Sequence, residues 1–304
     1  MLGDNLPQPS AVVSLIQSTG IIRGVRLYSP DPNALQALRG SNLRILLDVP
    51  NSNLQSLASN PSAAASWVQT NIQPYVPDVS FKYLAVGNEV IPGWQAQYVL
   101  PAMQNIWAAL ASAGLTNQIA VSTSVSTGVL GQSYPPSAGT FSSDALRYLQ
   151  PIVHFLINTR APLLANVYSY FSYIGNPGQI SLQYALFTSP GTVVQDGPNA
   201  YQNLFDAILD SLYSSLEKIG GANVPIVVSE SGWPSNGGFA ATIENAQTYN
   251  SNLVKHVAQG TPKRPGAIEA YIFALFNENL KQPHGTENNF GLFYPNQQPV
   301  YAFH

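Results

Sequence analysis

Residues 201–232 read YQNLFDAILDSLYSSLEKIGGANVPIVVSESG, and this stretch decides the fold class. Its first part predicts a helix over Tyr201–Ile219, with Gly220 and Gly221 as the stop. The apolar residues of this part lie at helical spacing: Leu204, Phe205, Ile208, Leu212, Leu216 and Ile219. Its second part, Pro225–Gly232, is short and almost continuously apolar, as parallel strands covered on both faces are. The stretch therefore predicts one helix followed by one buried strand.

Helix and strand patterns of this kind alternate from one end of the chain to the other. Similar helical stripes end before Gly114 and before Gly260. The seven strand candidates are Gly24–Tyr28, Leu43–Val49, Lys82–Glu89, Ile119–Val125, Leu163–Tyr170, Pro225–Gly232 and Ala270–Glu278. Because no composition break divides this alternation, we expect a single α/β domain over residues 1–304.

Chain length and missing nucleotide motifs favour one α/β architecture. No GxGxxG or GxxxxGK[ST] follows any strand candidate, so a nucleotide-binding doubly wound sheet loses its usual signature. A (β/α)8 TIM barrel needs roughly 250 residues plus insertions, which fits a chain of 304 residues. A closed barrel of this type has one strand more than the seven candidates found here.

Composition and charge argue against several classes of function. The chain has 12 Lys and Arg against 15 Asp and Glu, and no basic stretch, so we expect no nucleic-acid partner. It has no cysteine and four scattered histidines, so we expect no metal site. The apolar runs are too short for a membrane span, and residues 1–10 lack the regions of a signal peptide. Abundant aromatic and uncharged polar residues would suit a sugar-binding surface, although ordinary core and surface tyrosines explain them equally well.

Three strand candidates end in a glutamate, namely Glu89, Glu230 and Glu278, although the chain has only 15 acidic residues. Active sites of TIM barrels lie at the C-terminal ends of the strands. A salt bridge at the barrel rim would explain any one of these acids equally well, but it is a poor explanation for all three. Two carboxylates that flank a glycosidic bond are the minimum set for sugar hydrolysis. Asn88 could then bind a sugar 2-hydroxyl, and Trp233 offers a flat face for a sugar ring.

Several longer motifs resemble one known family. Plant endo-1,3-β-glucanases of glycoside hydrolase family 17 contain stretches similar to AVGNE (85–89), VVSESGWPS (227–235), FNEN (276–279) and NFGLFYPNQQPVY (289–301). The resemblance extends over the whole chain and implies a retaining enzyme with no cofactor. Glu89 would be the general acid/base and Glu230 the nucleophile, with carboxyl groups about 5–5.5 Å apart.

The resemblance also implies roles for residues around this pair. Glu278, Lys281 and Glu287 match positions that lie beside the pair and orient it. Tyr28 matches a tyrosine next to the nucleophile. Tyr170, Phe171 and Phe290 match aromatic residues that line the cleft, and core packing is the alternative for these three. A strand that precedes the MLGDNLP segment in the family is absent from this chain, so we expect a barrel without its first strand and with two unpaired edges.

The resemblance leaves three functions open. The first is endo-hydrolysis of β-1,3-glucan, the second is hydrolysis of mixed-linkage 1,3;1,4-β-glucan, and the third is non-catalytic glucan binding in defence. The expected partner is therefore a β-glucan polysaccharide, acted on by a monomer. The resemblance further suggests a plant protein that is secreted to the cell wall or stored in the vacuole.

Overall fold

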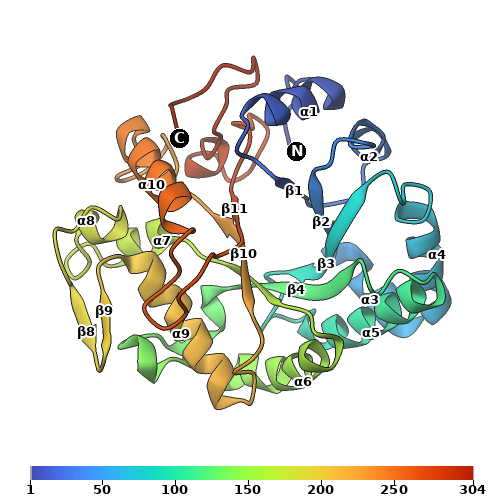
Figure 1. Ribbon diagram of the computed structural model, residues 1–304, viewed down its shortest axis with the longest axis horizontal. Coiled ribbons are helices and arrows are strands. Elements are labelled where there is room, and N and C mark those ends of the chain that lie inside the picture. The colour runs from blue at the N-terminus through green and yellow to red at the C-terminus, as the bar shows by residue number, and fades with distance from the viewer. Residues whose placement is uncertain (1, 304) are drawn as a thin grey trace.

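The computed structural model describes residues 2–303 and contains a parallel seven-stranded sheet within that range. The strands follow one another in chain order around a nearly closed barrel (Figure 1). They are β1 (Gly24–Leu27), β2 (Arg44–Val49), β3 (Ser80–Asn88), β4 (Ala120–Ser126), β7 (Leu163–Asn166), β10 (Ile226–Ser231) and β11 (Ala270–Ile272). The expected (β/α)8-type barrel with seven strands is therefore confirmed.

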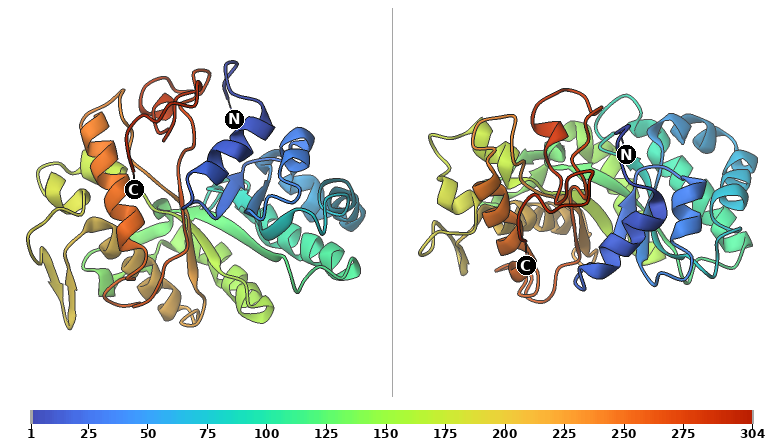
Figure 2. Two further views of the ribbon diagram at one scale, coloured as in Figure 1. Left: turned by 45° about the horizontal axis from the view of Figure 1, so that its top comes forward. Right: turned by 90° about the horizontal axis from the view of Figure 1, so that it is seen from above.

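Helices connect the strands and surround the sheet (Figures 1 and 2). The α-helices are α1 (Pro9–Ser18), α2 (Pro32–Ala37), α3 (Leu54–Ser59), α4 (Pro61–Asn71), α5 (Ala96–Ser112), α6 (Ser143–Thr159), α7 (Ser169–Gly175), α8 (Leu182–Ala185), α9 (Leu204–Lys218) and α10 (Ile243–His256). The 3-10 helices are η1 (Asn51–Asn53), η2 (Thr127–Val129), η3 (Pro136–Ala138) and η4 (Thr286–Asn288). Two small antiparallel pairs lie in the long connections: β5 (Leu130–Gln132) with β6 (Thr140–Phe141), and β8 (Val194–Asp196) with β9 (Asn199–Tyr201).

Helix α9 shows why these residues form a helix packed on the sheet. Asn203 caps it, since its side-chain oxygen accepts a hydrogen bond from the Asp206 backbone N–H at 2.8 Å. Its apolar stripe is buried against the barrel, and the chain turns after it through Gly220, whose φ of 86° favours glycine. The predicted helix and its stop are therefore confirmed, but the helix begins at Leu204, because Tyr201 is the last residue of β9.

The hydrophobic core has two parts, one on each side of the barrel wall. The larger part lies between the strands and the helices. The smaller part fills the barrel interior with buried side chains from four strands: Leu46, Tyr83, Ala85, Leu164 and Val227. A filled interior is typical of small barrels, and it leaves the strand ends as the place for a binding site.

Two predicted strands end more than one residue earlier than the sequence pattern indicated. β7 ends at Asn166 rather than Tyr170, because α7 already begins at Ser169. β11 ends at Ile272 rather than Glu278, because the residues after it form only isolated bridges, such as Phe276 to Phe293. Glu278 is therefore not a strand-end residue, and that part of the prediction is wrong.

The two ends of the sheet, β1 and β11, lie next to each other without forming a ladder in the part of the chain that the structure describes. Both views in Figure 2 place the N-terminal segment beside the loops after β11. The backbone N–H of Leu2 donates to Glu278 Oε1 at 2.7 Å, and the N–H of Leu280 donates to the Leu2 carbonyl at 2.9 Å. These contacts tie the chain's beginning to the rim of the barrel.

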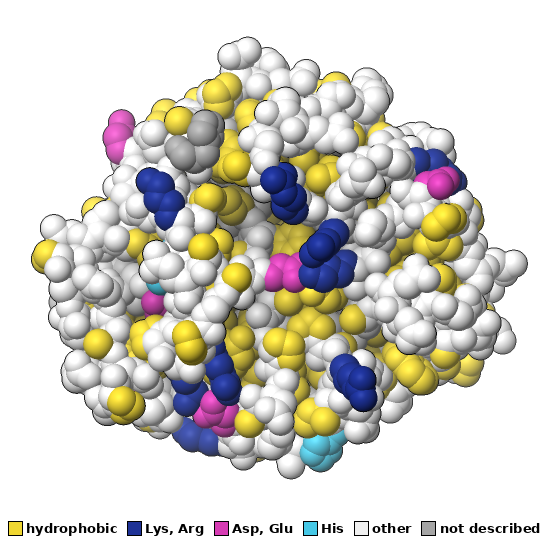
Figure 3. Space-filling model, in the orientation of Figure 1, with side chains coloured by type: hydrophobic (Ala, Val, Ile, Leu, Met, Phe, Trp, Pro, Cys, Tyr) yellow, Lys and Arg dark blue, Asp and Glu magenta, His cyan; other side chains and the backbone are white. Residues whose placement is uncertain are grey.

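Charged residues make up 9% of the chain. Figure 3 shows only scattered Lys, Arg, Asp and Glu side chains on one face of the molecule. None of the helices described within residues 2–303 is both long enough and apolar enough to cross a membrane.

Candidate active site

The backbone is irregular at the two strand ends that carry Glu89 and Glu230. The register between β3 and β4 shifts between Ala85 and Asn88, and that between β10 and β7 shifts between Val228 and Glu230. Glu89 itself has a φ of 55°, in the left-handed region that is uncommon for residues other than glycine. Irregularities of this kind re-aim side chains at the ends of barrel strands. Both glutamates are thereby directed into one hydrogen-bond network.

The carboxylate of Glu230 is buried and held by three donors. Its Oε1 accepts from Arg26 Nη1 at 2.8 Å and from the Tyr28 hydroxyl at 2.9 Å. Its Oε2 accepts from the Tyr168 hydroxyl at 2.6 Å. Burial, together with the negative charge of Glu230, raises the pKa of Tyr28 and of Tyr168 well above the usual range, so both hydroxyls remain donors. An ionised carboxylate accepts hydrogen bonds only, and these contacts match that form.

The environment of Glu89 is different and favours its neutral form. Its Oε1 accepts a single hydrogen bond within the described chain, from Asn166 Nδ2 at 2.8 Å. Burial is the main cause that raises the pKa of Glu89, and the negative charges of Glu230 and Glu287 raise it further. The Asn166 hydrogen bond and the positive charge of Arg26 act in the opposite direction. The two carboxyl groups therefore differ in their surroundings, since three donors hold Glu230 and one holds Glu89.

Arg26 in β1 connects the two carboxyl groups, and the sequence analysis did not identify it. Its Nη1 donates to Glu230 and, at 3.2 Å, to Asn166 Oδ1, the residue that holds Glu89. Its other acceptors are Asp48, Asn88, Ser124 and the Ser229 carbonyl. A single arginine in an otherwise apolar strand, GVRL, was the signal in the sequence that could have identified it.

Tyr168 and Asn166 were also missed. Asn166 is the last residue of β7, and Tyr168 follows it by two positions. The apolar pattern predicted a longer strand here, with Tyr170 and Phe171 as the candidate residues instead. A polar residue at the true C-terminal end of a barrel strand was the available signal.

Asn88 is positioned firmly beside Glu89. The Asn51 side chain accepts from its backbone N–H at 2.9 Å and donates to its carbonyl at 3.0 Å. Its Oδ1 accepts from Arg26 and Asn166, whereas its side-chain NH2 makes no hydrogen bond to any residue between 2 and 303. That NH2 group is a free donor at the edge of the network.

Lys281 and Glu287 lie close to the pair, whereas Glu278 does not contact it. Lys281 Nζ is 2.9 Å from Glu287 Oε2 and 4.0 Å from the centre of the Phe273 ring. Phe273 packs edge-on against Tyr28, whose hydroxyl contacts Glu230. Glu278 instead accepts from the Leu2 backbone N–H. Its side chain therefore anchors the N-terminal segment.

Three of the predicted sugar-contacting aromatic residues are buried, so this part of the prediction is wrong. Trp233 and Tyr170 are 0% exposed and Phe290 is 2% exposed. The Trp233 indole N–H donates to the Ala240 carbonyl at 2.9 Å, and its ring packs against Tyr170. An aromatic side chain whose polar atom finds a backbone partner is stable in a core. Phe290 packs against Tyr168 and Tyr170 packs against Phe171, so two of these rings support residues of the site.

Two predicted aromatic residues remain accessible. Phe171 is 43% exposed and packs against the ring of Tyr168. Tyr28 is 41% exposed as a whole residue, although its hydroxyl is turned inward to Glu230. These rings offer apolar surface next to the catalytic candidates, which is what the CH faces of a sugar would contact.

A cavity of about 250 Å³ adjoins Glu89. It is lined by Asn51, Glu89, Val90, Gly93, Trp94 and Gln95. Trp94 is 72% exposed, so its ring stands open to solvent at this cavity. A sugar unit bound beside Glu89 would therefore meet an aromatic face that the sequence analysis did not select.

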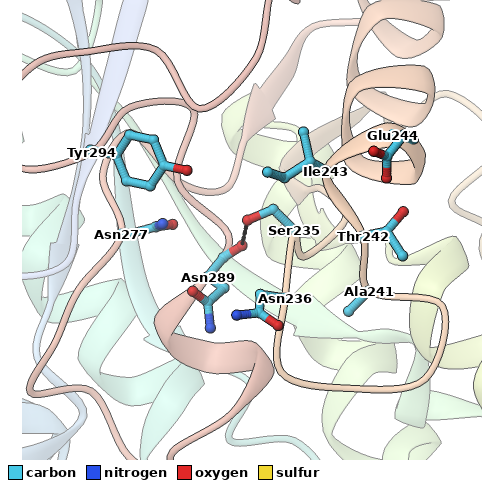
Figure 4. Close-up of a pocket in the computed structure, with 9 residues that line it drawn as sticks. All are labelled: Ser235, Asn236, Ala241, Thr242, Ile243, Glu244, Asn277, Asn289 and Tyr294. Carbon is cyan, nitrogen blue, oxygen red and sulfur yellow. Dashed lines mark hydrogen bonds between the residues drawn. The ribbon is translucent and has the colours of Figure 1, made fainter.

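A second cavity of about 430 Å³ lies apart from both glutamates, between the start of α10 and the segment around Asn277 and Tyr294 (Figure 4). Ser235 Oγ donates to the Asn289 carbonyl at 3.1 Å across it. None of the predicted site residues lines this cavity.

Within residues 2–303, no group of three or more His, Cys, Asp or Glu side chains is arranged to hold a metal ion.

Comparison with known proteins identifies the family and agrees with the fold. A sequence model described as "Glycosyl hydrolases family 17" matches residues 1–304. The chain is 57% identical over 303 residues to a glucan endo-1,3-beta-glucosidase of Vitis vinifera, covering 98% of this chain and 88% of the relative. It is 55% identical over 305 residues to a basic vacuolar isoform from Nicotiana tabacum, covering 99% and 82%.

A solved structure from work on two plant beta-glucan endohydrolases with distinct substrate specificities superposes with a TM-score of 0.96. It is 52% identical in sequence, and the match covers 100% of this chain and 97% of that one. The family match, the two relatives and this structure extend over nearly the whole chain, including the strand ends that carry Glu89 and Glu230. The chain is therefore a glycoside hydrolase and belongs to glycosyl hydrolase family 17.

Proposed function

We propose that this enzyme hydrolyses internal β-1,3-glucosidic linkages in β-glucans by a double displacement that retains the anomeric configuration. One observation carries the proposal: Glu89 and Glu230 are joined through Asn166 and Arg26 by hydrogen bonds of 2.8, 3.2 and 2.8 Å. A retaining pair must share one anomeric centre, with carboxyl groups about 5–5.5 Å apart. Two acids linked through one amide and one guanidinium support that arrangement. The names of the relatives support the substrate class.

In the first step, the neutral carboxyl group of Glu89 gives its proton to the glycosidic oxygen. Glu230 attacks the anomeric carbon with one carboxylate oxygen, the bond to the leaving sugar breaks, and a glycosyl ester forms. In the second step, Glu89 removes a proton from water, the water oxygen attacks the anomeric carbon, and Glu230 leaves as a carboxylate. Each carboxyl group ends in the state in which it began.

The environment of Glu89 supports this change of role. While Glu230 is ionised, its charge helps to raise the pKa of Glu89. When Glu230 becomes an ester, that charge is lost, so the pKa of Glu89 falls and the group can act as a base. Arg26, Tyr28 and Tyr168 hold the nucleophile in place.

Other side chains have supporting roles in this proposal. The free NH2 group of Asn88 binds the sugar 2-hydroxyl, where a hydrogen bond strengthens as the transition state forms. The exposed faces of Tyr28, Phe171 and Trp94 contact sugar rings. The Lys281–Glu287 ion pair orients the groups around Glu89.

Laminarin hydrolysis tests the proposal. NMR should detect the β-anomer first, and both Glu230→Ala and Glu89→Gln should lose most of the activity. An α-anomer as the first product would exclude retention, and laminarin binding without product would indicate a glucan-binding protein. A higher rate on cereal β-glucan than on laminarin would instead favour the mixed-linkage alternative.

The cellular setting and assembly are part of the same proposal. Residues 1–304 act as one catalytic domain and as a monomer, in the vacuole or the cell wall. The vacuolar isoform among the relatives supports this location. A single unfolding transition and the mass in solution by light scattering test the domain and the monomer, since two transitions or a dimer mass would contradict them.

A further inference from the structure

Arg26 is bound on its other side by a second carboxylate, that of Asp48 in β2. Arg26 Nε donates to Asp48 Oδ1 at 3.0 Å, and Nη2 donates to Oδ2 at 2.7 Å. Both side chains are almost fully buried, with 4% and 3% of their surface exposed. The guanidinium therefore lies between Asp48 and Glu230, whose carboxylate is 2.8 Å from Nη1.

Asp48 has no side-chain hydrogen bond or ion pair other than with Arg26 in the part of the chain that the structure describes. Burial raises the pKa of Asp48, and the charge and hydrogen bonds of Arg26 act against this rise. A buried acid is costly unless it is paired. Both oxygens of Asp48 accept from a guanidinium that is always protonated, which is the geometry of a charged pair. Asp48 is therefore positioned to pair with Arg26.

The two hydrogen bonds to Asp48 also orient the guanidinium plane. With Nε and Nη2 held by Asp48, Nη1 points at Glu230 and Asn166, and Nη2 also reaches Asn88. A planar fork held at two points cannot rotate about the bond to its side chain. The orientation of Arg26, and through it the positions of the nucleophile and of the residues beside Glu89, depends on Asp48.

We infer that Asp48 is a positioning residue that keeps Arg26 paired and oriented while the charge of Glu230 disappears and returns during the reaction. This inference rests on the proposed double displacement. In the glycosyl ester Glu230 carries no charge, so without Asp48 the buried Arg26 would be an unpaired cation. It would then also face a transition state with positive charge on the sugar. Asp48 takes no proton and forms no bond in either step.

The test replaces Asp48 by its uncharged isostere, and Asp210 provides the matched control. Asp210 is also fully buried, and its partners, Tyr201, Thr261 and the Lys263 backbone N–H, lie outside the site. Asp48→Asn should lower kcat on laminarin on the order of 100-fold, as expected when a catalytic group is misplaced, with KM nearly unchanged. Asp210→Asn should leave kcat and KM at the wild-type values. Asp48→Glu, which keeps the charge, should recover part of the lost kcat.

A fluorosugar that traps the glycosyl ester separates the two proposals. With a 2-deoxy-2-fluoro laminaribiosyl fluoride, the wild-type enzyme should be labelled on Glu230, as mass spectrometry of the peptides would detect. Absence of a label on the wild type would overturn the double displacement itself. With the wild type labelled, Asp48→Asn should be labelled on the order of 100-fold more slowly. An equal labelling rate and an equal kcat would overturn the role of Asp48 alone.

A purely structural role for Asp48 predicts a different pattern. In that case Asp48→Asn would lower the melting temperature but leave the kcat of the folded enzyme unchanged, which counts against the inference. If Asp48→Asn does not fold, Asp48→Ser replaces it, since its hydroxyl also removes the negative charge that pairs with Arg26 on the side opposite Glu230. The same outcomes then apply.

Discussion

Asp210 in α9 makes the stability of this enzyme depend on pH in a way that one substitution can isolate. Its carboxyl group is fully buried and accepts from Thr261 Oγ1, the Tyr201 hydroxyl and the Lys263 backbone N–H. Burial is the main cause that raises the pKa of Asp210, from 3.8 to about 6, against the effect of these hydrogen bonds. The folded state therefore prefers the neutral form of this acid.

The size and sign of the effect on stability follow from the difference between these two pKa values, 3.8 and about 6. Each pH unit between the two values corresponds to about 1.4 kcal/mol, so the preference for the neutral form is about 3 kcal/mol in the free energy of unfolding. Because the pKa is higher in the folded state, this contribution is fully present below pH 3.8 and is lost as the pH rises through about 6. The side chain thus stabilises the fold more in acid than at neutral pH.

Asp210→Asn removes the titration and keeps the shape of the side chain. Its NH2 group can donate to Thr261 Oγ1, while its oxygen accepts from Tyr201 and Lys263, as in the neutral acid. Urea unfolding of both proteins from pH 4 to pH 7 measures the difference between their free energies of unfolding, in which other titrating groups cancel. We expect the wild type to lose about 2–3 kcal/mol relative to the variant over this range. A difference that stays constant, or that changes in the opposite direction, would refute the assignment to Asp210.

Three further outcomes are expected at the site. Tyr168→Phe removes a hydrogen bond to the charged Glu230 and should lower kcat about 10- to 100-fold in laminarin kinetics; a change below twofold would contradict its role. Glu230→Gln removes a negative charge that raises the pKa of Glu89. The Glu89 carboxyl carbon should therefore titrate at lower pH in NMR spectra of the variant. An unchanged or higher pKa of Glu89 would be inconsistent with an effect of the Glu230 charge on Glu89. Trp233→Phe should lower the free energy of unfolding by about 1–3 kcal/mol and leave KM for laminarin unchanged, whereas a higher KM with full stability would restore Trp233 as a sugar contact.

The barrel strands were predictable because burial on both faces leaves a clear pattern in the sequence. The predicted strand Pro225–Gly232 is observed as Ile226–Ser231, and the boundaries coincide with a proline and a glycine. All seven predicted strands of the barrel are present within residues 2–303. Near-continuous apolar runs of this length identify parallel strands well when Gly and Pro mark their ends.

The ends of two strands were not predictable from the same pattern. After Asn166 the chain remains apolar into α7, and after Ile272 it remains apolar as irregular backbone. A buried helix start, a buried loop and a buried strand have the same composition over a few residues. Hydrogen bonding decides between them, and hydrogen bonding depends on the neighbouring segments rather than on the residues themselves. Glu278 was misplaced for this reason.

Some residues of the candidate site were likewise predictable from the sequence and others were not. A charged side chain inside an apolar strand is costly unless it has a buried partner, so its presence marks a place where the interior is polar. That reasoning identified Glu89 and Glu230, and it applies equally to Arg26 in GVRL and Asp48 in RILLDV, which the search for acids at strand ends passed over. An aromatic residue carries no such information, because its burial is favourable in a core and in a cleft alike. Trp233 is buried and Phe171 is 43% exposed, although each lies a few residues beyond the end of its strand. Charged residues near the C-terminal ends of apolar strands therefore mark the candidate site in the sequence, whereas the aromatic residues around it can be assigned only from coordinates.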